Sequence, residues 1–269
     1  MLYIIKIKII KFLNFFLRYF NLHIDSTVKR DEITKLISLM RIQDLGYNLI
    51  RVGADNDGGY LIPDILDQID TCFSPGVGKI HEFENQLNKK KINLYLADGT
   101  IDQSDIRIEK FNFLKKNLSS KNEENETTLQ SWIDDNYQNN NNNLILQMDI
   151  EGSEYEVINS TSKKYLELFK VLVIEFHFIE KLYNRLSYNI FLSSIKKILK
   201  SFHIAHIHPN NCQGYFKVCG ENLPTAIEVT FLRKDLCLKN KNIEKLPHDL
   251  DQKNIKALPD VYLSKNWYI

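Results

Sequence analysis

Short apolar runs recur through the middle of the chain and alternate with stretches in which apolar residues have helical spacing. Six runs, at residues 71–74, 93–97, 144–148, 171–176, 203–208 and 226–232, are rich in β-branched and aromatic residues. Such runs are typical of strands buried on both faces. Helices are predicted over residues 31–41, 82–90, 152–160 and 187–201. The repeated order of strand then helix predicts an α/β fold with a doubly wound, mostly parallel sheet flanked by helices.

The first twenty residues are strongly apolar, but Lys6, Lys8, Lys11 and Arg18 interrupt the run before it reaches the length of a membrane span. With helical spacing, Lys8, Lys11 and Arg18 fall opposite an apolar face. That face consists of Leu2, Ile5, Ile9, Leu13, Phe16 and Phe20. An N-terminal amphipathic helix is therefore predicted. Two roles stay open: peripheral contact of residues 1–22 with an anionic membrane surface, or packing on the domain or on a second copy in a homo-oligomer.

The composition suits one globular domain with short appendages, because 43% of the 269 residues are hydrophobic. We expect a helical lead-in over residues 1–45, a catalytic domain over 46–238 and a tail over 239–269 that wraps over the domain. Residues 119–126 and the asparagine run 139–143 predict loops. The four cysteines lie far apart, which predicts a reduced, cytoplasmic protein. A net charge of +1 gives no field that would recruit nucleic acid, so no such partner is expected.

Two predicted strands end in residues suited to a nucleoside ligand. The first runs into a turn with Gly76 and Gly78, where backbone N–H groups can approach a ligand closely. About twenty residues further on, the second strand ends in Asp98 and Gly99. An acid at this place in a dinucleotide-type sheet accepts hydrogen bonds from ribose hydroxyls. The structural alternatives are a tight turn without a ligand at Gly76 and a turn-capping role for Asp98.

The strand over residues 144–148 delivers Asp149 and Glu151 at its carboxyl end, where ligands bind in open α/β sheets. Burial there would raise the pKa of both acids, and a cationic ligand, a metal or a substrate hydroxyl would relieve the cost. In the structural alternative, Ser153 and Glu154 begin the next helix and the two acids belong to its solvated first turn.

Two later strands end in further titratable residues. Because side chains alternate along a strand, Glu175 and His177 point to the same side, so an acid and an imidazole face one cleft. The strand over residues 203–208 ends in His208, followed by Asn210 and Asn211. His177 and His208 are the better catalytic candidates because both lie at strand ends, whereas His203 and His206 are expected to be packed or surface residues.

Five segments together resemble the FkbM-type methyltransferases. They are DNDGGY (55–60), SPGVG (74–78), YLADGT (95–100), TLQSWI (128–133) and MDIEGSEYEVI (148–158), of which MDIEGSE is the most specific. The resemblance covers residues 55–234. It implies a Rossmann-like class I methyltransferase fold, S-adenosylmethionine as cofactor, and a place among enzymes that decorate capsular or other surface glycans or secondary metabolites.

Carried onto this sequence, the resemblance implies that Gly76 and Gly78 border the methionine part of the cofactor and that Asp98 holds its ribose. Ser74 stands where the commoner acid-x-Gly-x-Gly-x-Gly form has an acid, and Asp55, Asp57 or Tyr60 would compensate by closing over the site. The implied cofactor-binding residues are Asp57, Gly58, Tyr60, Ser74, Pro75, Gly76, Val77, Gly78, Asp98, Gly99, Asp149 and Glu151.

We therefore predict an S-adenosylmethionine-dependent O-methyltransferase that acts on a hydroxyl of a sugar, a nucleotide-sugar or a related small polar acceptor in polysaccharide biosynthesis. Sugar hydroxyls are very weak acids, so a base should remove the proton as the new bond forms. His177 or His208 is predicted as the base, with Asp149 and Glu175 orienting it or the substrate. A divalent cation bound by Asp149, Glu151 or Glu175 is the alternative means of lowering the hydroxyl pKa.

Two other functions remain open at this point. Another nucleotide-sugar-dependent α/β enzyme would explain the glycine turn and Asp98, but not MDIEGSE followed by EFH. A noncatalytic, membrane-peripheral scaffold in a glycan assembly complex would give the N-terminal helix the main role, at the inner face of the membrane, and would leave the acids structural.

Overall fold

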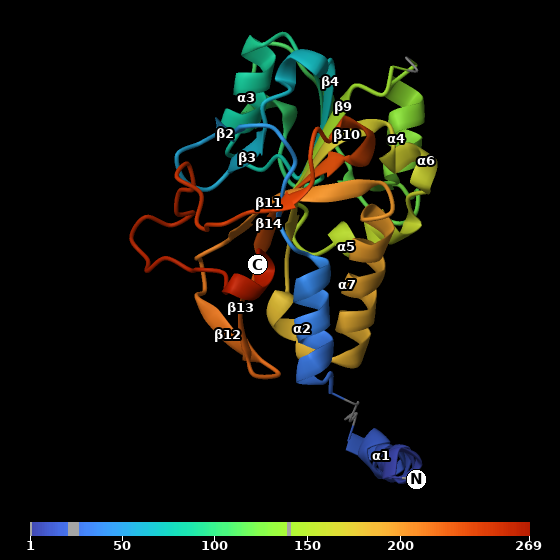
Figure 1. Cartoon of the computed structure of the whole chain (residues 1–269). Coiled ribbons are helices and arrows are strands. Elements are labelled where there is room, and N and C mark those ends of the chain that lie inside the picture. Colours follow the sequence, from blue (N-terminus) through green and yellow to red (C-terminus); the bar gives the residue numbers. More distant parts are fainter. Residues whose placement is uncertain (1, 21–26, 139–140) are drawn as a thin grey trace.

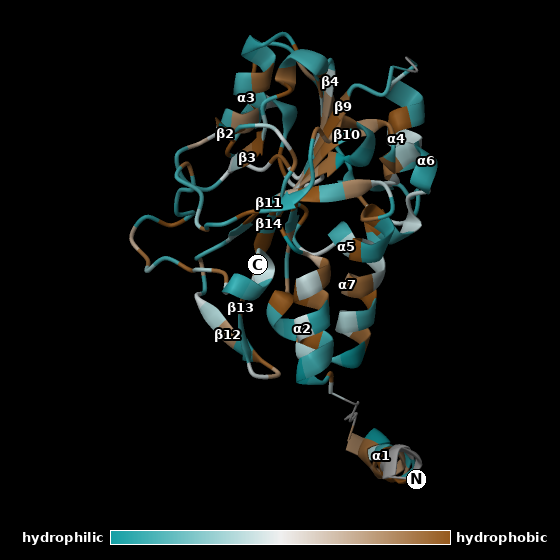
Figure 2. Cartoon of the chain, in the orientation of Figure 1, coloured by the Kyte–Doolittle hydropathy of each residue, from teal (hydrophilic) through white to brown (hydrophobic). Residues whose placement is uncertain are grey.

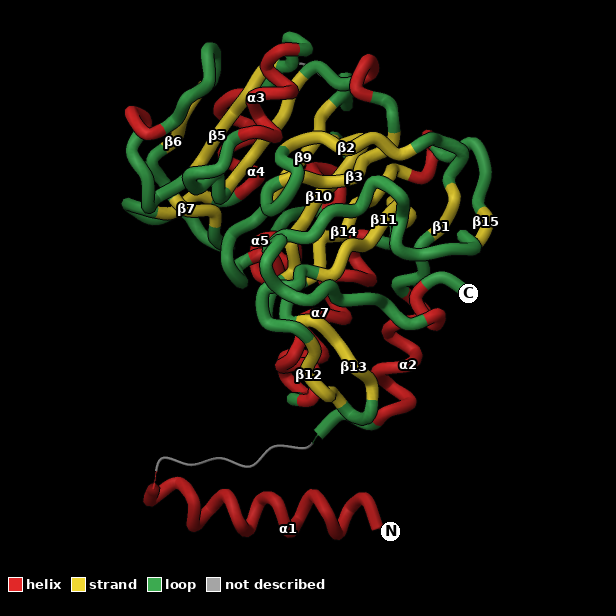
Figure 3. Tube along the Cα trace, turned by 90° about the vertical axis from the view of Figure 1, so that its left-hand side faces the viewer, coloured by secondary structure: helices red, strands yellow, loops and turns green. Residues whose placement is uncertain are grey.

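The computed structural model describes residues 2–20, 27–138 and 141–269. Its centre is a seven-stranded sheet in the order β11-β14-β10-β9-β4-β5-β6 (Figures 1 and 3). These strands are β4 (Thr71–Pro75), β5 (Asn93–Ala97), β6 (Asn112–Leu114), β9 (Leu144–Met148), β10 (Phe169–Phe176), β11 (Phe202–Pro209) and β14 (Ile227–Arg233). From β10 to β6 all neighbours run parallel, whereas β14 is antiparallel to both β10 and β11. The predicted α/β fold with a mostly parallel sheet is confirmed.

Helices cover both faces of this sheet and bury two separate cores. The helices are α2 (Arg30–Leu39), α3 (Glu82–Lys89), α4 (Leu129–Asn136), α5 (Glu154–Ser160), α6 (Lys163–Leu166) and α7 (Arg185–Ile198). Apolar residues of α2, α4, α5 and α7 share one core with the sheet, and Trp132 packs edge-on against Phe73 at 4.9 Å between ring centroids. On the opposite face, α3 and the hairpin of β2 (Leu49–Gly53) and β3 (Gly59–Pro63) bury the second core.

The simple order of strand then helix ends after β11. A hairpin of β12 (Tyr215–Val218) and β13 (Glu221–Pro224) stands there in place of a helix, and the chain then returns as β14. An antiparallel return needs no crossover helix, which is why a short hairpin suffices. The predicted loop at residues 119–126 joins β7 (Asn117–Leu118) to β8 (Glu126–Thr127). Of the asparagine run, residues 139–140 lie outside the described residues.

The N-terminal segment forms helix α1 (Leu2–Leu17), followed by a 3-10 turn over Arg18–Phe20. Both views place α1 apart from the α/β body (Figures 1 and 3). Phe12 and Phe15, which lie outside the predicted apolar face, are 65% and 61% exposed, so apolar side chains are not confined to one side of the helix. Figure 2 shows hydrophilic and hydrophobic residues intermixed along it. Among the described residues, no helix is both long and apolar enough to cross a membrane.

The C-terminal tail runs back over the body and is anchored at several points. Strand β15 (Lys241–Asn242) pairs with β1 (Gln43–Asp44), and the last turn, Lys265–Trp267, lies beside α2. The Asn211 side chain donates a hydrogen bond to the carbonyl of Ile255 and accepts one from its N–H. The tail therefore lies against the carboxyl-terminal end of β11.

Candidate active site

A cavity of about 490 Å³ opens at the carboxyl ends of β4, β5 and β9. This is the edge of a doubly wound sheet where ligands bind, because the strand order reverses around β4 and leaves a crevice there. Nine residues predicted from the sequence line it: Asp57, Gly58, Tyr60, Gly76, Val77, Gly78, Asp98, Asp149 and Glu151. Among the described residues, Ser74, Pro75, Gly99, Glu175, His177 and His208 lie outside this lining.

The two glycines of the turn after β4 serve different purposes. Both have positive φ angles, +80° at Gly76 and +58° at Gly78. A Cβ atom on Gly76 would lie 1.6 Å from the carbonyl oxygen of Asp149, so this glycine lets two strand ends approach each other. A Cβ on Gly78 would meet no atom within 4 Å. Gly78 therefore leaves space for a ligand, whereas Gly76 is required by packing.

Asp98 is held as a carboxylate at the cavity wall. One oxygen accepts the Gly78 N–H at 3.0 Å, and the other accepts both the N–H and the hydroxyl of Thr100, at 2.7 and 2.6 Å. Burial opposes ionisation, but these hydrogen bonds from Thr100 and Gly78 hold the pKa of Asp98 below its usual value. Asp98 thus orders the turn after β5, as the structural alternative expected. It also lines the cavity with an acceptor that remains ionised.

The opposite wall carries Asp149, and the imidazole of His177 lies behind this acid, outside the cavity lining. Asp149 Oδ1 lies 3.7 Å from His177 Nε2, and Glu154 Oε1 lies 3.0 Å from His177 Nδ1. Burial raises the pKa of Asp149 to about 7, although His177 opposes the shift. Burial opposes protonation of His177, but Glu154, Asp149 and Glu151 together raise its pKa. The pair therefore has a proton to exchange near neutral pH, and Glu154 orients the imidazole.

Of the two acids expected to be buried at the end of β9, Asp149 is half-buried, with 29% of its side chain exposed, and the expectation is wrong for Glu151. The Glu151 side chain is 85% exposed, at a residue with φ of +55°. The buried acid of this motif is instead Glu154, at 0% exposure. Its Oε1 also accepts the N–H groups of Ile150 and Gly152 and so closes the loop around the strand end. From the sequence, Glu154 is expected only to begin the next helix, with no role in the site.

A comparison with known protein families identifies the family of this chain. The model of the methyltransferase FkbM domain matches residues 39–204, well over half of the chain. The chain belongs to the FkbM methyltransferase family. A comparison with curated proteins found no match. The matched region of this methyltransferase ends within β11, so the hairpin, β14 and the tail lie outside it.

Glu175 lies behind the cavity in a second group of buried acids. Glu175 Oε1 lies 3.9 Å from His177 Nε2, so the prediction that the Glu175 and His177 side chains point to one side agrees with the structure. Across the sheet Glu175 faces Glu228, and the two carboxylates accept amide hydrogen bonds from Asn210 and Asn254, at 2.9 and 2.5 Å respectively. Burial, with Glu228 and Asp149 nearby, raises the pKa of Glu175 well above its usual value.

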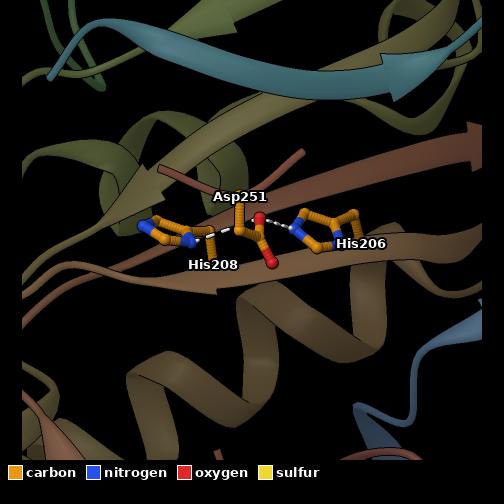
Figure 4. A group of neighbouring side chains, drawn as sticks. All are labelled: His206, His208 and Asp251. Atoms are coloured by element: carbon orange, nitrogen blue, oxygen red, sulfur yellow. Dashed lines mark hydrogen bonds and ion pairs between the residues drawn. The ribbon is translucent and has the colours of Figure 1, made fainter. Parts of the chain in front are cut away.

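His208 belongs to a different cluster from His177. Strand pairing places His208 beside Glu228 and Glu228 beside Glu175. His208 is therefore two strands, about 10 Å, from Glu175. Figure 4 shows Asp251 of the tail between two imidazoles: Oδ1 lies 2.8 Å from His206 Nε2 and 3.3 Å from His208 Nδ1. Sequence reasoning missed Asp251, because the tail carries no local signal for it.

In the described part of the methyltransferase, three groups of side chains could each hold a metal ion. Within each group, the donor atoms lie within 4.8 Å of one another. The groups are Asp149, Glu151 and His177; Asp57, Glu175 and Glu228; and His206, His208 and Asp251. Of the three acids predicted as possible cation ligands, Asp149 and Glu151 belong to the first group, and Glu175 belongs to the second with Glu228, its neighbour on β14.

Proposed function

We propose that this methyltransferase uses S-adenosylmethionine to methylate a hydroxyl oxygen of a sugar, a nucleotide-sugar or a related small polar acceptor, in surface glycan biosynthesis. The supporting observation is that one cavity has the Gly78 turn and Asp98 on one wall and Asp149, backed by His177, on the other. The first wall suits a nucleoside, and the second suits a group that loses a proton.

The wall with the Gly78 turn and Asp98 is the part of the cavity that would bind the cofactor. S-adenosylmethionine, when bound, supplies an electrophilic methyl group, so the protein has to position the acceptor and manage one proton. Asp98 is an ionised acceptor for ribose hydroxyls, and the open face of Gly78 leaves its surroundings free for the ligand. The residues present therefore fit the cofactor that is typical of the family.

The acceptor wall is rich in carboxylates, which favours hydroxyl-bearing substrates. Asp57 and Asp149 line the cavity, and Glu175 lies directly behind them. Each carboxylate oxygen accepts hydrogen bonds, and Asp149 Oδ1 is a buried oxygen with no hydrogen-bond partner among the described residues. We assign Asp149 and His177 jointly as the base. Asp149 receives the hydroxyl proton, and His177, oriented by Glu154, balances the negative charge of the Asp149 carboxylate before the transfer.

Calorimetric titration with S-adenosylmethionine and S-adenosylhomocysteine, with and without magnesium, tests the cofactor. Saturable binding is expected. Absence of binding in all four titrations would favour a scaffold or a different nucleotide ligand. A change in affinity or stoichiometry on adding magnesium would support the divalent cation predicted from the sequence.

Methyl transfer from labelled S-adenosylmethionine to nucleotide-linked sugars, compared with oligosaccharides, tests the acceptor. The expected product is a methyl ether, which survives mild base. A base-labile methyl ester or an N-methyl product would overturn the assignment of a hydroxyl acceptor.

A further inference from the structure

A buried carboxylate with no cationic partner opens onto the cavity beside the glycine turn. Glu84 of α3 is 3% exposed and lines the cavity together with Gly76 and Val77. None of the ion pairs between described residues includes it, and the charged neighbour that acts on it is another acid, Glu82. Burial raises the pKa of Glu84 to about 7. A buried acid without a cationic partner is costly to ionise, and a cationic ligand in the cavity would reduce that cost.

Glu84 also lies in the place where the glycine turn lacks an acid. Ser74 is fully buried, and its hydroxyl lies 2.5 Å from Glu84 Oε1. The carboxylate is therefore carried by the first turn of α3 and reaches the end of β4 from the side. The serine fits this arrangement because it is small and provides a hydrogen bond to the incoming acid.

The hydrogen bonds that connect Glu84 to the side chains behind it can form whether Glu84 is protonated or ionised. Ser74 Oγ is also 2.7 Å from Gln147 Oε1, and Gln147 Nε2 donates to the Tyr60 hydroxyl at 3.2 Å. A serine hydroxyl has one hydrogen, so it cannot donate to both acceptors at once. With Glu84 protonated, the chain runs from Glu84 through Ser74 and Gln147 to Tyr60. With Glu84 ionised, rotation of the Gln147 amide reverses every bond of the chain.

We propose that Glu84 binds the ammonium group of the cofactor's amino-acid part, and so supplies from α3 the carboxylate that Ser74 does not. The assignment rests on the proposed use of S-adenosylmethionine. Both acids line the cavity. Asp98 is the acceptor proposed for the ribose, and Glu84, through its contact with Ser74, lies beside the glycine turn, where the resemblance places the amino-acid part. Reversal of the Gln147 chain lets Glu84 ionise as the ammonium enters, with no hydrogen bond lost.

A ligand pair isolates this contact. Wild-type protein and Glu84→Gln are titrated with S-adenosylhomocysteine and with its analogue that lacks only the amino group. Glutamine keeps the size of the side chain and a partner for Ser74. We expect Glu84→Gln to weaken binding of S-adenosylhomocysteine roughly ten- to a hundredfold, the value of a hydrogen bond to a charged group, and binding of the analogue less than about threefold. The two changes are Glu84→Gln in the protein and removal of the amino group from the ligand. If their effects on the binding free energy are not additive, the difference measures the contact between the carboxylate and the ammonium group.

Glu82→Gln is the matched control, because Glu82 lies on the same helix, is exposed and lies outside the cavity lining. Because Glu82 is the smallest of the influences on the pKa of Glu84, this change should alter both affinities by less than about threefold. The wild-type titrations alone already test the assignment: equal affinity for the two ligands would overturn it while the proposed function stood. Equal weakening of both ligands by Glu84→Gln would also overturn it. If wild-type protein bound neither ligand, the proposed function itself would fail.

Discussion

At the scale of single residues, the local contacts of two similar acids in the candidate site determine whether each stays ionised or can take up a proton. Asp98 and Asp149 both follow a strand and both line the cavity, yet their surroundings have opposite effects. Hydrogen bonds hold the pKa of Asp98 below its usual value, and burial raises that of Asp149 to about 7. One acid is therefore an acceptor that stays charged, and the other can take up a proton.

Asp98→Ala should weaken cofactor binding by about 1 to 3 kcal/mol, because ribose hydroxyls would lose a buried acceptor. Calorimetric titration with S-adenosylhomocysteine measures this change. Asp98 also accepts hydrogen bonds from Gly78 and Thr100, so thermal unfolding should be followed in parallel to separate local disorder of the turn from lost contact. Unchanged affinity in a folded variant would remove Asp98 from the site.

His177→Gln should lower turnover roughly a hundredfold or more while cofactor affinity is kept, because Asp149 loses the imidazole that balances the charge of its carboxylate. His208→Gln is the matched control, since His208 lies in the separate cluster with Asp251. Its turnover should stay within a fewfold of wild type. The reverse pattern, with only His208→Gln inactive, would transfer the role of base to the tail cluster.

At the scale of elements, the C-terminal tail completes a polar row that the sheet begins. Asn254 donates hydrogen bonds to Asp57 of the cavity lining and to buried Glu228, and Asp251 joins the imidazoles of His206 and His208. The tail lies beyond the matched residues 39–204. Its contacts stabilise the carboxyl-terminal end of β11 and the acids next to the candidate site.

Asp251→Ala should lower the free energy of unfolding by about 3 kcal/mol at pH 7, because the buried His206 and His208 side chains lose the carboxylate that lies between them. Burial opposes ionisation, but His206 and His208 hold the pKa of Asp251 well below its usual value. Its contribution is therefore present above the unfolded pKa and is lost as the pH falls. Urea denaturation at pH 7 and pH 3 measures the effect. An equal loss at both values would contradict the ion-pair explanation.

Helix α1 presents apolar side chains together with exposed Lys8 and Lys11. Removal of residues 1–22 should therefore abolish sedimentation with anionic lipid vesicles and leave cofactor affinity unchanged. The full chain with Lys8→Glu and Lys11→Glu is the control for charge and should sediment less with these vesicles. A truncated protein that unfolds and binds no cofactor would show instead that the helix belongs to the core.

At the scale of the whole molecule, buried acids set the dependence of stability on pH. The raised pKa values of Glu84 and Asp149, each about 7, mean that the folded protein keeps protons that the unfolded chain releases near pH 4. The free energy of unfolding should therefore fall as pH rises from about 5 to 8. The raised pKa of His177 acts in the same direction, because its stabilising charge is lost as the pH rises.

For Glu84, the rise from 4.5 to about 7 corresponds to roughly 3 kcal/mol across this range. Urea denaturation at one-unit pH steps should show the slope, and Glu84→Gln should reduce it. Stability that is constant from pH 5 to 8 would show that these acids are not protonated in the folded protein.

The sequence by itself determined six of the seven strands of the sheet, all but β6, together with the turn after β4 and the acids at the strand ends. Period-two and helical apolar patterns and glycine at positive φ are local properties. Tertiary structure alone decided the direction of β14, the separation of His208 from His177, and the arrival of Glu84, Asp251 and Asn254 from α3 and the tail. These contacts join residues far apart in the chain. The choice among them rests on which surfaces pack together, and local patterns do not encode that choice.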